Sequence, residues 1–509
     1  MEAPQALEPA ESAPLIAVVD IGSNTIRLVE YEVVAKAGLR LLRAFKEVPR
    51  LAHGLADDGS LRREAIEQGA RAVRRLLRRL PPARQRSVVA VATSAVREAA
   101  NGEAFIERVE AIAGIRPQIL SAEEEGRYAY LGVSNAWHLG SDLVVDLGGG
   151  SMQVVRTARG KLARVLSLPL GTVRLTDRFL PHDPPREREV DDLREFVRDA
   201  LADLPNAPRR ARVFAVGGSA RALARTSMEL TDYPLRTVHG YPLRLKDLKG
   251  LTAVLRGMPA KRRRDVPGLD RTRADVIVAG LVTLREVADR FGASHLIVSA
   301  HGIRDGLAQE ASGLPAARTS TELVDRSAVV EARAFRFSLP HGREVADTAE
   351  DLFDAVRARV GWKEEERLAL RAGALLHDVG SLVDSWHHAR HSAYILRHTA
   401  IGGLTHRAAA MAVLAALGHE GEPLPEGWRR TWRTVLSDRD LAAGERLGAI
   451  LFVAERLHGA SVKFRLSRTS PGVLIRSGRR RSSSPEPQRL DRLEKHIRRT
   501  LGLDRDGNR

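Results

Sequence analysis

A repeated motif restricts the fold of this 509-residue chain more than any other feature of its sequence. Residues 18–25 read VVDIGSNT and residues 144–151 read VVDLGGGS, an offset of 126 positions. Each copy is a β-branched run that ends at an aspartate and passes through small residues into a second apolar run, which predicts a β-hairpin with a tight tip. Two matched hairpins indicate two similar modules in one chain.

Strand and helix patterns alternate through the first 312 residues. Between the hairpins, the periodicity predicts a helix over 64–80, a strand over 87–93, a helix over 102–113 and a short strand at 119–120. After the second hairpin come a strand, glycine turn and helix over 213–221, and a strand over 295–299. This alternation favours α/β layers.

From about residue 321 the pattern becomes helical. Amphipathic periods over 345–360, 367–377 and 407–417 predict a separate all-α domain after a linker at 313–315. Beyond it, a strand at 473–475 and a short helix at 490–501 are predicted. We expect a disordered segment (1–13), two α/β domains (14–135 and 136–312), a helical domain (321–460) and a basic C-terminal region (461–509).

Composition excludes several function classes. The chain has no cysteine, so disulfides, thiolate nucleophiles and cysteine-based zinc sites are ruled out. Aromatic residues are only 4%, which argues against a nucleic-acid binder that stacks bases. The N-terminus lacks a basic signal region, and the longest apolar run, 408–418, is far below the ~18 residues that span a bilayer. A cytoplasmic protein with no membrane partner is expected.

Positive charge is concentrated near the C-terminus. The net charge is +17, and residues 461–509 hold 14 basic against 5 acidic residues, including Arg479, Arg480 and Arg481. Such a tail raises the local concentration of polyanions such as polyphosphate, nucleotides or RNA. A solvated tail of an arginine-rich chain would carry the same charge, and the sequence leaves both interpretations open.

The two hairpin tips suit phosphate chemistry. Glycines let backbone N–H groups approach an anion, and an aspartate at the strand end can hold Mg²⁺ or position water. A single such tip could be an ordinary turn, but two copies and the glycine turn at 217–219 favour a phosphate chain held between them. Arg97 could bind phosphate or form a surface ion pair, and Glu123 to Glu125 could include a general base or begin a helix.

Histidines gather in the helical region. His377 and Asp378 end an apolar helical run, with His341 upstream and His391 and His419 downstream. Histidines and a carboxylate on several helices can hold a divalent metal in the core of a bundle. Each histidine taken singly is more often a hydrogen-bonded structural residue.

Motifs at 18–25, 93–102, 124–128, 146–151 and 216–220 resemble the exopolyphosphatase/guanosine pentaphosphate phosphohydrolase (Ppx/GppA) family in order and spacing. The resemblance continues at 267–269, 273–277 and 299–306, and it covers roughly residues 14–460. It implies two actin/sugar-kinase-like (ribonuclease H-like) α/β domains with the active site in their cleft, followed by an HD-like all-α domain. It also implies a homodimer that removes terminal phosphate from inorganic polyphosphate, or converts pppGpp to ppGpp, with Mg²⁺.

The resemblance assigns roles by position. Glu125 matches the catalytic base, and Asp20 and Asp146 match the carboxylates at the two hairpins that hold Mg²⁺. The phosphate-binding positions it implies are Gly22, Ser23, Asn24, Thr25, Arg97, Gly148, Gly149, Gly150, Ser151, Gly218 and Ser219. The HD-like metal candidates are His341, His377, Asp378, His391 and His419, with a further histidine-rich run at 387–392.

Two positions depart from the family pattern. Gln153 stands where the second hairpin usually carries a glutamate, so a carbonyl oxygen remains and a negative charge is lost. Near the end of the helical domain, Glu455 and His458 stand where aspartates are usual, and Glu455 could substitute as a ligand. The leading prediction of function is exopolyphosphatase activity. The alternatives are pppGpp hydrolysis, a catalytically weakened sensor of polyphosphate or alarmone, and a kinase or ATP-driven chaperone.

Overall fold

The computed structural model describes residues 13–52, 59–83, 85–421 and 424–459, together with two strands at 464–469 and 472–477. The chain forms two compact units. Met1–Thr231 with Val238–Arg318 is the α/β unit, and Asp232–Thr237 with Thr319–Arg509 is the helical unit. Of the described residues, no helix combines the length and the apolar character that crossing a membrane requires.

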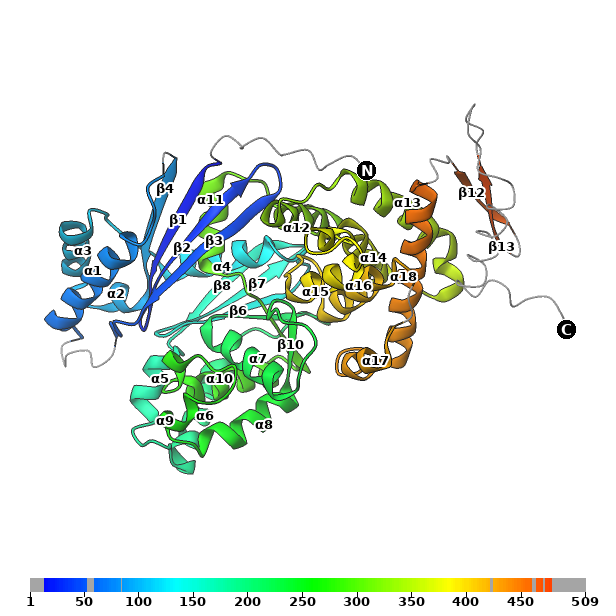
Figure 1. The fold of residues 1–509 in the computed structure, drawn as a ribbon. Coiled ribbons are helices and arrows are strands. Elements are labelled where there is room, and N and C mark those ends of the chain that lie inside the picture. Colours follow the sequence, from blue (N-terminus) through cyan, green and yellow to red (C-terminus); the bar gives the residue numbers. More distant parts are fainter. Residues whose placement is uncertain are drawn as a thin grey trace. The chain divides into compact units, whose positions relative to one another are not determined.

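The first sheet of the α/β unit grows from the first predicted hairpin. Its strand order is β3-β2-β1-β4-β5. The strands are β1 (Leu15–Ile21), β2 (Ile26–Val34), β3 (Gly38–Glu47), β4 (Arg86–Ala92) and β5 (Gln118–Ile119). β1 pairs antiparallel with β2 and parallel with β4. Helices α1 (Arg63–Leu77) and α3 (Gly102–Ala113) contribute to the buried cluster on one side of this sheet, with the short α2 (Ser94–Glu98) after β4 (Figure 1).

The second sheet repeats this plan. Its order is β10-β11-β9-β6-β7-β8, from β6 (Leu143–Leu147), β7 (Met152–Ala158), β8 (Lys161–Leu168), β9 (Val213–Val216), β10 (Tyr241–Arg244) and β11 (His295–Val298). β6 pairs antiparallel with β7 and parallel with β9, as β1 does with β2 and β4. The predicted repeat is therefore confirmed. It extends to a third strand in each module, β3 and β8, that the sequence analysis did not predict.

Helices complete the α/β unit. They are α4 (Ala122–Ser134), α5 (Thr172–Phe179), α6 (Glu187–Ala202), α7 (Gly218–Leu230), α8 (Leu245–Arg256), α9 (Ala260–Arg263), the 3₁₀ turn η1 (Arg271–Arg273), α10 (Ile277–Arg290) and α11 (Ile303–Ser312). α11 returns to the first sheet, where Leu307 and Ala308 pack in one cluster with Ile16 and Val18 of β1. The last helix of the unit thus brings residues near 304 to the first hairpin.

The helical unit is built around one largely buried helix, α16 (His406–Gly418). Its elements are α12 (Ser320–Phe335), α13 (Pro340–Val360), α14 (Glu364–Leu375), the 3₁₀ turn η2 (Val379–Leu382), α15 (His388–His398), α16 (His406–Gly418), α17 (Glu426–Trp432) and α18 (Asp438–Gly459). The apolar run 408–418 belongs to α16, which packs against α14, α15 and α18. Glycines allow the last contact, since a Cβ on Gly448 would lie 3.0 Å from the Cα of Gly418. The predicted all-α domain is confirmed.

The C-terminal region holds a two-stranded ribbon, β12 (Phe464–Thr469) and β13 (Gly472–Ser477). β13 contains the predicted strand 473–475, and its partner β12 was not predicted. Residues 1–12, the arginines 479–481 and the predicted helix 490–501 lie outside the described residues.

Candidate active site

One cavity of the α/β unit collects the tips of both hairpins. The described residues that line it include Gly22, Ser23, Asn24 and Thr25 from the first tip, Gly148, Gly149, Gly150 and Ser151 from the second, and Gly217 and Gly218 from the β9–α7 turn. In both hairpins the first glycine donates its N–H to the carbonyl of the residue three positions on, Thr25 or Ser151, at 3.0 Å. The sequence repeat is thus a repeat of the same turn.

Small residues are required where the two modules meet. A Cβ on Gly150 would lie 2.1 Å from the Oγ of Ser94, which follows β4 of the first module. Gly217 has φ +104°, a backbone conformation that side chains other than glycine's rarely adopt. A larger residue at position 150 would push the second tip away from the first module, and one at position 217 would meet the Leu147 carbonyl of its own module, so Gly150 sets how closely the two modules approach.

Two residues that line this cavity carry buried donors without a partner in the described part of the chain. The Nδ2 of Asn24 and the Oγ of Ser94 are buried, and neither has a hydrogen-bond partner among the described residues. Buried polar atoms are rarely left unpaired in proteins. A ligand with many acceptor oxygens would satisfy both donors.

Three carboxylates line the same cavity. Asp20 is the penultimate residue of β1, Asp146 occupies the equivalent position of β6, and Glu125 lies in the first turn of α4. Of the adjacent glutamates, Glu124 accepts the N–H of Ser121 at 2.7 Å in a capping box, whereas Glu125 is only 3% exposed. The helix-start interpretation is therefore confirmed for Glu124, and Glu125 stays a candidate for the general base.

Burial changes the protonation of two of these carboxylates. Desolvation raises the pKa of Glu125 to about 7, although the nearby Arg97 guanidinium opposes the shift. Desolvation raises the pKa of Asp146 to about 6, partly offset by the positive charge of Arg221. A buried carboxylate whose pKa is near neutrality can accept a proton at physiological pH.

Four arginines complete the lining, and sequence reasoning did not assign them a role. They are Arg27 on β2, Arg221 on α7, Arg273 in η1 and Arg304 on α11. Arg304 Nη1 lies 3.2 Å from Asp20 Oδ2, and Arg221 Nη1 donates to the Ala300 carbonyl at 2.8 Å. Burial, followed by repulsion from Arg304, Arg221 and Arg273, holds the pKa of Arg27 well below its usual range. Four crowded guanidinium groups form a strong site for a polyanion.

Comparison with known proteins decides the family. The model of the Ppx/GppA phosphatase family matches residues 31–312, more than half of the chain, and that of Ppx/GppA phosphatase domain III matches residues 325–422. The chain belongs to the Ppx/GppA phosphatase family. Membership places it among the phosphatases, which are hydrolases.

Solved structures agree with this assignment. A Ppx/GppA family member from Aquifex aeolicus is 30% identical at a TM-score of 0.50, and the match covers 58% of this chain and 97% of that one. A crystal structure described as an exopolyphosphatase-like protein is 26% identical at a TM-score of 0.53, with 59% and 99% covered. An exopolyphosphatase from Cytophaga hutchinsonii, 23% identical at 0.54 over 59% and 99%, shares the fold. The two α/β modules are thus the actin/sugar-kinase-like domains that the sequence resemblance implied.

Most of the predicted Ppx/GppA residues meet in the cavity, but two do not line it. Arg97 instead forms an ion pair with Glu125 and donates to the Leu120 carbonyl at 2.8 Å, so it holds the candidate base. Ser219 is buried behind the cavity, 3.4 Å from Arg273 Nη1. Gln153 lines the cavity beside Asp146, its β-sheet partner, and its Nε2 donates to Ser151 Oγ at 2.9 Å.

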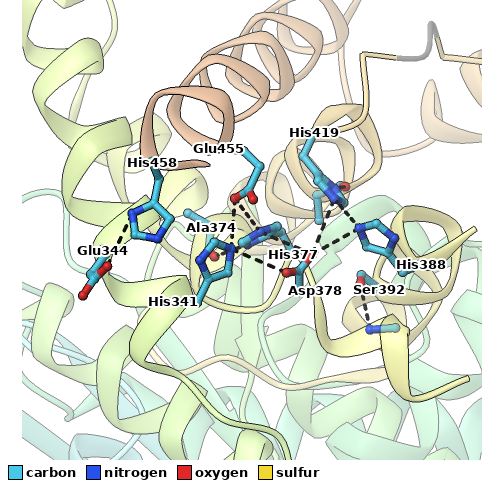
Figure 2. Close-up of polar contacts among 12 residues, drawn as sticks. His341, Glu344, Ala374, His377, Asp378, His388, Ser392, His419, Glu455 and His458 are labelled. Atoms are coloured by element: carbon cyan, nitrogen blue, oxygen red, sulfur yellow. Dashed lines mark hydrogen bonds and ion pairs between the residues drawn. The ribbon is translucent and has the colours of Figure 1, made fainter. Parts of the chain in front are cut away.

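The histidine candidates of the helical unit also meet, with one exception. His341, His377, Asp378 and His419 lie together, and the neighbouring Glu455 and His388 join them (Figure 2). His391 is absent from every group of potential ligand atoms in the described chain. His388, the first residue of α15, takes the place predicted for His391, because the start of the helix sets which histidine of the run 387–392 faces this cluster.

Proposed function

We propose that this Ppx/GppA protein is a Mg²⁺-dependent exopolyphosphatase that releases the terminal phosphate of inorganic polyphosphate. The observation that carries the proposal is the convergence of Arg27, Arg221, Arg273 and Arg304 on a cavity that also holds three carboxylates. A chain of phosphates presents charge to several arginines at once, and each charge-assisted hydrogen bond adds to its affinity. A compact uncharged substrate would gain no binding affinity from these four arginines.

The donor set fits Mg²⁺. Asp146 and Glu125 offer carboxylate oxygens and Gln153 an amide oxygen, which are the hard ligands this ion takes. Asp20 and Asp146 raise the pKa of Glu125 through repulsion, so a dication among them would stabilise the ionised forms of all three. Asp146 and Gln153 would hold the ion, which when bound would neutralise charge on the phosphate oxygens, and Glu125 would stay free to act as a base.

Glu125 is the group best placed to activate water. With a pKa of about 7 it is close to half ionised at neutral pH, and Arg97 fixes its carboxylate. In the proposed step Glu125 takes a proton from water, the water oxygen bonds to the terminal phosphorus, and the bond from that phosphorus to the bridging oxygen breaks. The products are orthophosphate and a chain one phosphate shorter. The arginines bind the phosphate oxygens throughout.

A second pocket favours pppGpp as the alternative substrate. It shares Arg27 and Arg304 with the first cavity and continues between β2, β3 and η1. Its walls are partly apolar, with Leu41 and Phe45 on β3, and partly polar, with Asn135 and Asp270. A nucleoside joined to phosphates in the first cavity would find an apolar surface and hydrogen-bond partners here, whereas polyphosphate has no use for the apolar wall.

Phosphate release from long-chain polyphosphate and from pppGpp, measured on one preparation with Mg²⁺, tests the proposal. We expect faster release from polyphosphate, and loss of release in Glu125→Gln. Leu41→Trp fills the second pocket at a residue that is 57% exposed, so the fold should tolerate it. Selective loss of pppGpp hydrolysis in this variant, with pppGpp the better wild-type substrate, would favour the alternative. Binding of both substrates without release would favour a sensor, and phosphate transfer from ATP to an acceptor a kinase.

A further inference from the structure

We propose that Glu98 and Arg174 are positioning residues for phosphate release, because they link the second hairpin tip to the candidate base Glu125. The described residues that line the first cavity include neither of them, so neither is expected to touch substrate. This role rests on the proposed function, in which Glu125 accepts a proton from water.

The link begins at Glu125 in the first turn of α4. Its carboxylate pairs with Arg97, and Nη1 of Arg97 also donates to the Leu120 carbonyl at 2.8 Å. These contacts hold the guanidinium against the first module. Nη2 of Arg97 lies 3.8 Å from Oε1 of Glu98, the last residue of α2. Arg97 is therefore shared between two carboxylates, of which the first is buried and the second is exposed.

Arg174 carries the link into the second module. It lies in the first turn of α5, where its Nη2 pairs with Oε2 of Glu98. Nε of the same guanidinium donates to the Gly150 carbonyl at 2.9 Å. A guanidinium group has a rigid fork of donors, so it can hold two acceptors at once in a fixed geometry. One side chain thus binds the end of α2 and the backbone of the second hairpin tip.

The contact with Gly150 fixes one peptide group of the phosphate-type turn. Because the peptide bond is planar and trans, the Gly150 carbonyl and the N–H of Ser151 point in opposite directions. Arg174 therefore turns the Ser151 N–H away from itself, and Ser151 lines the cavity. The start of α5 also donates backbone N–H groups to the carbonyls of the two preceding glycines, at 3.0 and 2.8 Å. The turn and the start of α5 are thus joined by several hydrogen bonds.

The short helix α2 meets the second module at both of its ends. A Cβ on Gly150 would lie 2.1 Å from Oγ of Ser94, the first residue of α2. Glu98, which pairs with Arg174, is the last residue of the same helix. Arg97, which pairs with the candidate base, lies between these two contacts. The position of the second tip is therefore coupled to the position of Arg97.

The exposure of the link indicates a role in positioning and not in stability. The side chains of Glu98 and Arg174 are 42% and 41% exposed, and exposed ion pairs contribute little to the stability of a fold. A misplacement of about 1 Å can nevertheless lower the rate of a reaction on the order of 100-fold. We therefore expect these two residues to act on the rate of phosphate release.

The two residues should act on Glu125 in opposite directions. Burial raises the pKa of Glu125 most, and the charged groups that also shift it are Arg97, Asp146 and Asp20. Only the arginine favours the ionised form, since the two aspartates repel it. Glu98 competes with Glu125 for Arg97, whereas Arg174 pairs with Glu98 and so leaves Arg97 to the base.

The pH dependence of kcat/KM for release from polyphosphate, measured with Mg²⁺, tests the link. Glu98→Gln removes the competing carboxylate, so the acid limb should move to lower pH. Arg174→Met frees Glu98 to draw Arg97 away from the base, so the acid limb should move to higher pH. Because the base is then misplaced, kcat of Arg174→Met should also fall by roughly 10-fold. Partial unfolding would lower the rate of both variants without moving their acid limbs in opposite directions.

Matched variants show whether the effect passes through Arg97. In the Arg97→Met background, Arg174→Met should change kcat by less than about threefold, because the link to the base is already broken. Glu107→Gln on α3 and Arg178→Met, one turn further along α5, remove exposed charges outside the link and should keep the wild-type profile. Equal losses of kcat from Arg174→Met in both backgrounds, or limb shifts of the same sign in Glu98→Gln and Arg174→Met, would overturn the proposal.

Crystal structures of the same variants keep this role separate from the proposed function. In Arg174→Met the Arg97 guanidinium should turn from Glu125 toward Glu98, and an unmoved guanidinium would overturn the link whether or not the protein releases phosphate. Loss of release in Glu125→Gln, with unchanged pH profiles in folded Glu98→Gln and Arg174→Met, would overturn the link and leave the proposed base intact. Full release in Glu125→Gln would instead contradict the proposed base, on which this role rests.

Discussion

The two hairpins of the α/β unit share one turn but place different residues opposite their aspartates. Asp20 of β1 pairs across the sheet with Arg27, and Asp146 of β6 pairs at the same register position with Gln153. The first aspartate also contacts Arg304, whereas desolvation raises the pKa of the second to about 6. Under the proposed function, the arginine partner would give the first repeat a phosphate-binding character and the amide partner would leave the second aspartate to bind Mg²⁺, which replaces the Mg²⁺ role that the resemblance implied for Asp20.

This division explains how a duplicated module can build an asymmetric site. The cationic side of the cavity, with Arg27 and Arg304, suits the oxygens of the phosphate chain. The carboxylates Asp146 and Glu125 suit a dication and a base. Variants of these residues should therefore affect phosphate binding and Mg²⁺ binding separately.

The largest effect is expected from Asp146→Asn. This change keeps the size of the side chain and removes the carboxylate on the metal side, so phosphate release should fall on the order of 10³-fold. Steady-state phosphate release over a range of Mg²⁺ concentrations measures it. Asp192→Asn, at an exposed position of α6, is the control and should retain wild-type rates. Full activity of Asp146→Asn would contradict the metal role of the second hairpin.

A smaller effect, on substrate affinity, is expected from Arg27→Met. Loss of one charge-assisted contact costs about 1.5–3 kcal/mol, which corresponds to roughly a 10- to 100-fold rise in KM for polyphosphate. The Mg²⁺ dependence should not change. Arg164→Met, on β8 outside the cavity, is the matched control. A shift of the Mg²⁺ dependence with unchanged KM would reverse the roles of the hairpins.

Gln153→Glu sharpens the comparison by adding a charge to the second hairpin. The new carboxylate would lie beside Asp146 and strengthen the metal side, so the Mg²⁺ concentration for half-maximal release should fall by about 3- to 10-fold. Gln153→Met, which adds no charge, should not lower it. A higher Mg²⁺ requirement in Gln153→Glu would show that the neutral amide is needed at this position.

The pH profile of Arg97→Met gives the smallest expected effect. Arg97 stabilises the ionised form of Glu125 and so lowers its pKa against the larger effect of burial. Without the guanidinium the pKa should rise further above about 7, and the base should ionise only at higher pH. The acid limb of kcat/KM against pH should then move to higher pH by roughly 1 unit. An unmoved limb would mean that another group is the base.

Local features of the fold were predictable from the sequence, and the arginine array was not. The hairpin tips and the helix over 102–113 follow from glycine placement and periodicity, which act within a few residues. Arg27, Arg221, Arg273 and Arg304 come from four elements that are far apart in the sequence, and only the folded α/β unit brings them together. One local signal existed, namely an arginine in the otherwise apolar start of β2.

Edge strands and helix phase account for the other differences. β3 and β8 are edge strands with many partly exposed residues, so they lack the alternation that marks a half-buried strand. His391 and His388 are three residues apart, and the start of α15 decides which of them lies beside His419. Helix ends are the least certain feature of a sequence-based prediction.

Equilibrium binding to the two hairpin variants tests the central claim most directly. Short-chain polyphosphate binding is measured by calorimetry in the presence of a chelator, and Mg²⁺ binding is measured without polyphosphate. Arg27→Met should weaken polyphosphate binding and leave Mg²⁺ binding intact, and Asp146→Asn should weaken Mg²⁺ binding and leave polyphosphate binding intact. Equal loss of both ligands in both folded variants, or the opposite pattern, would contradict the division between the two hairpins.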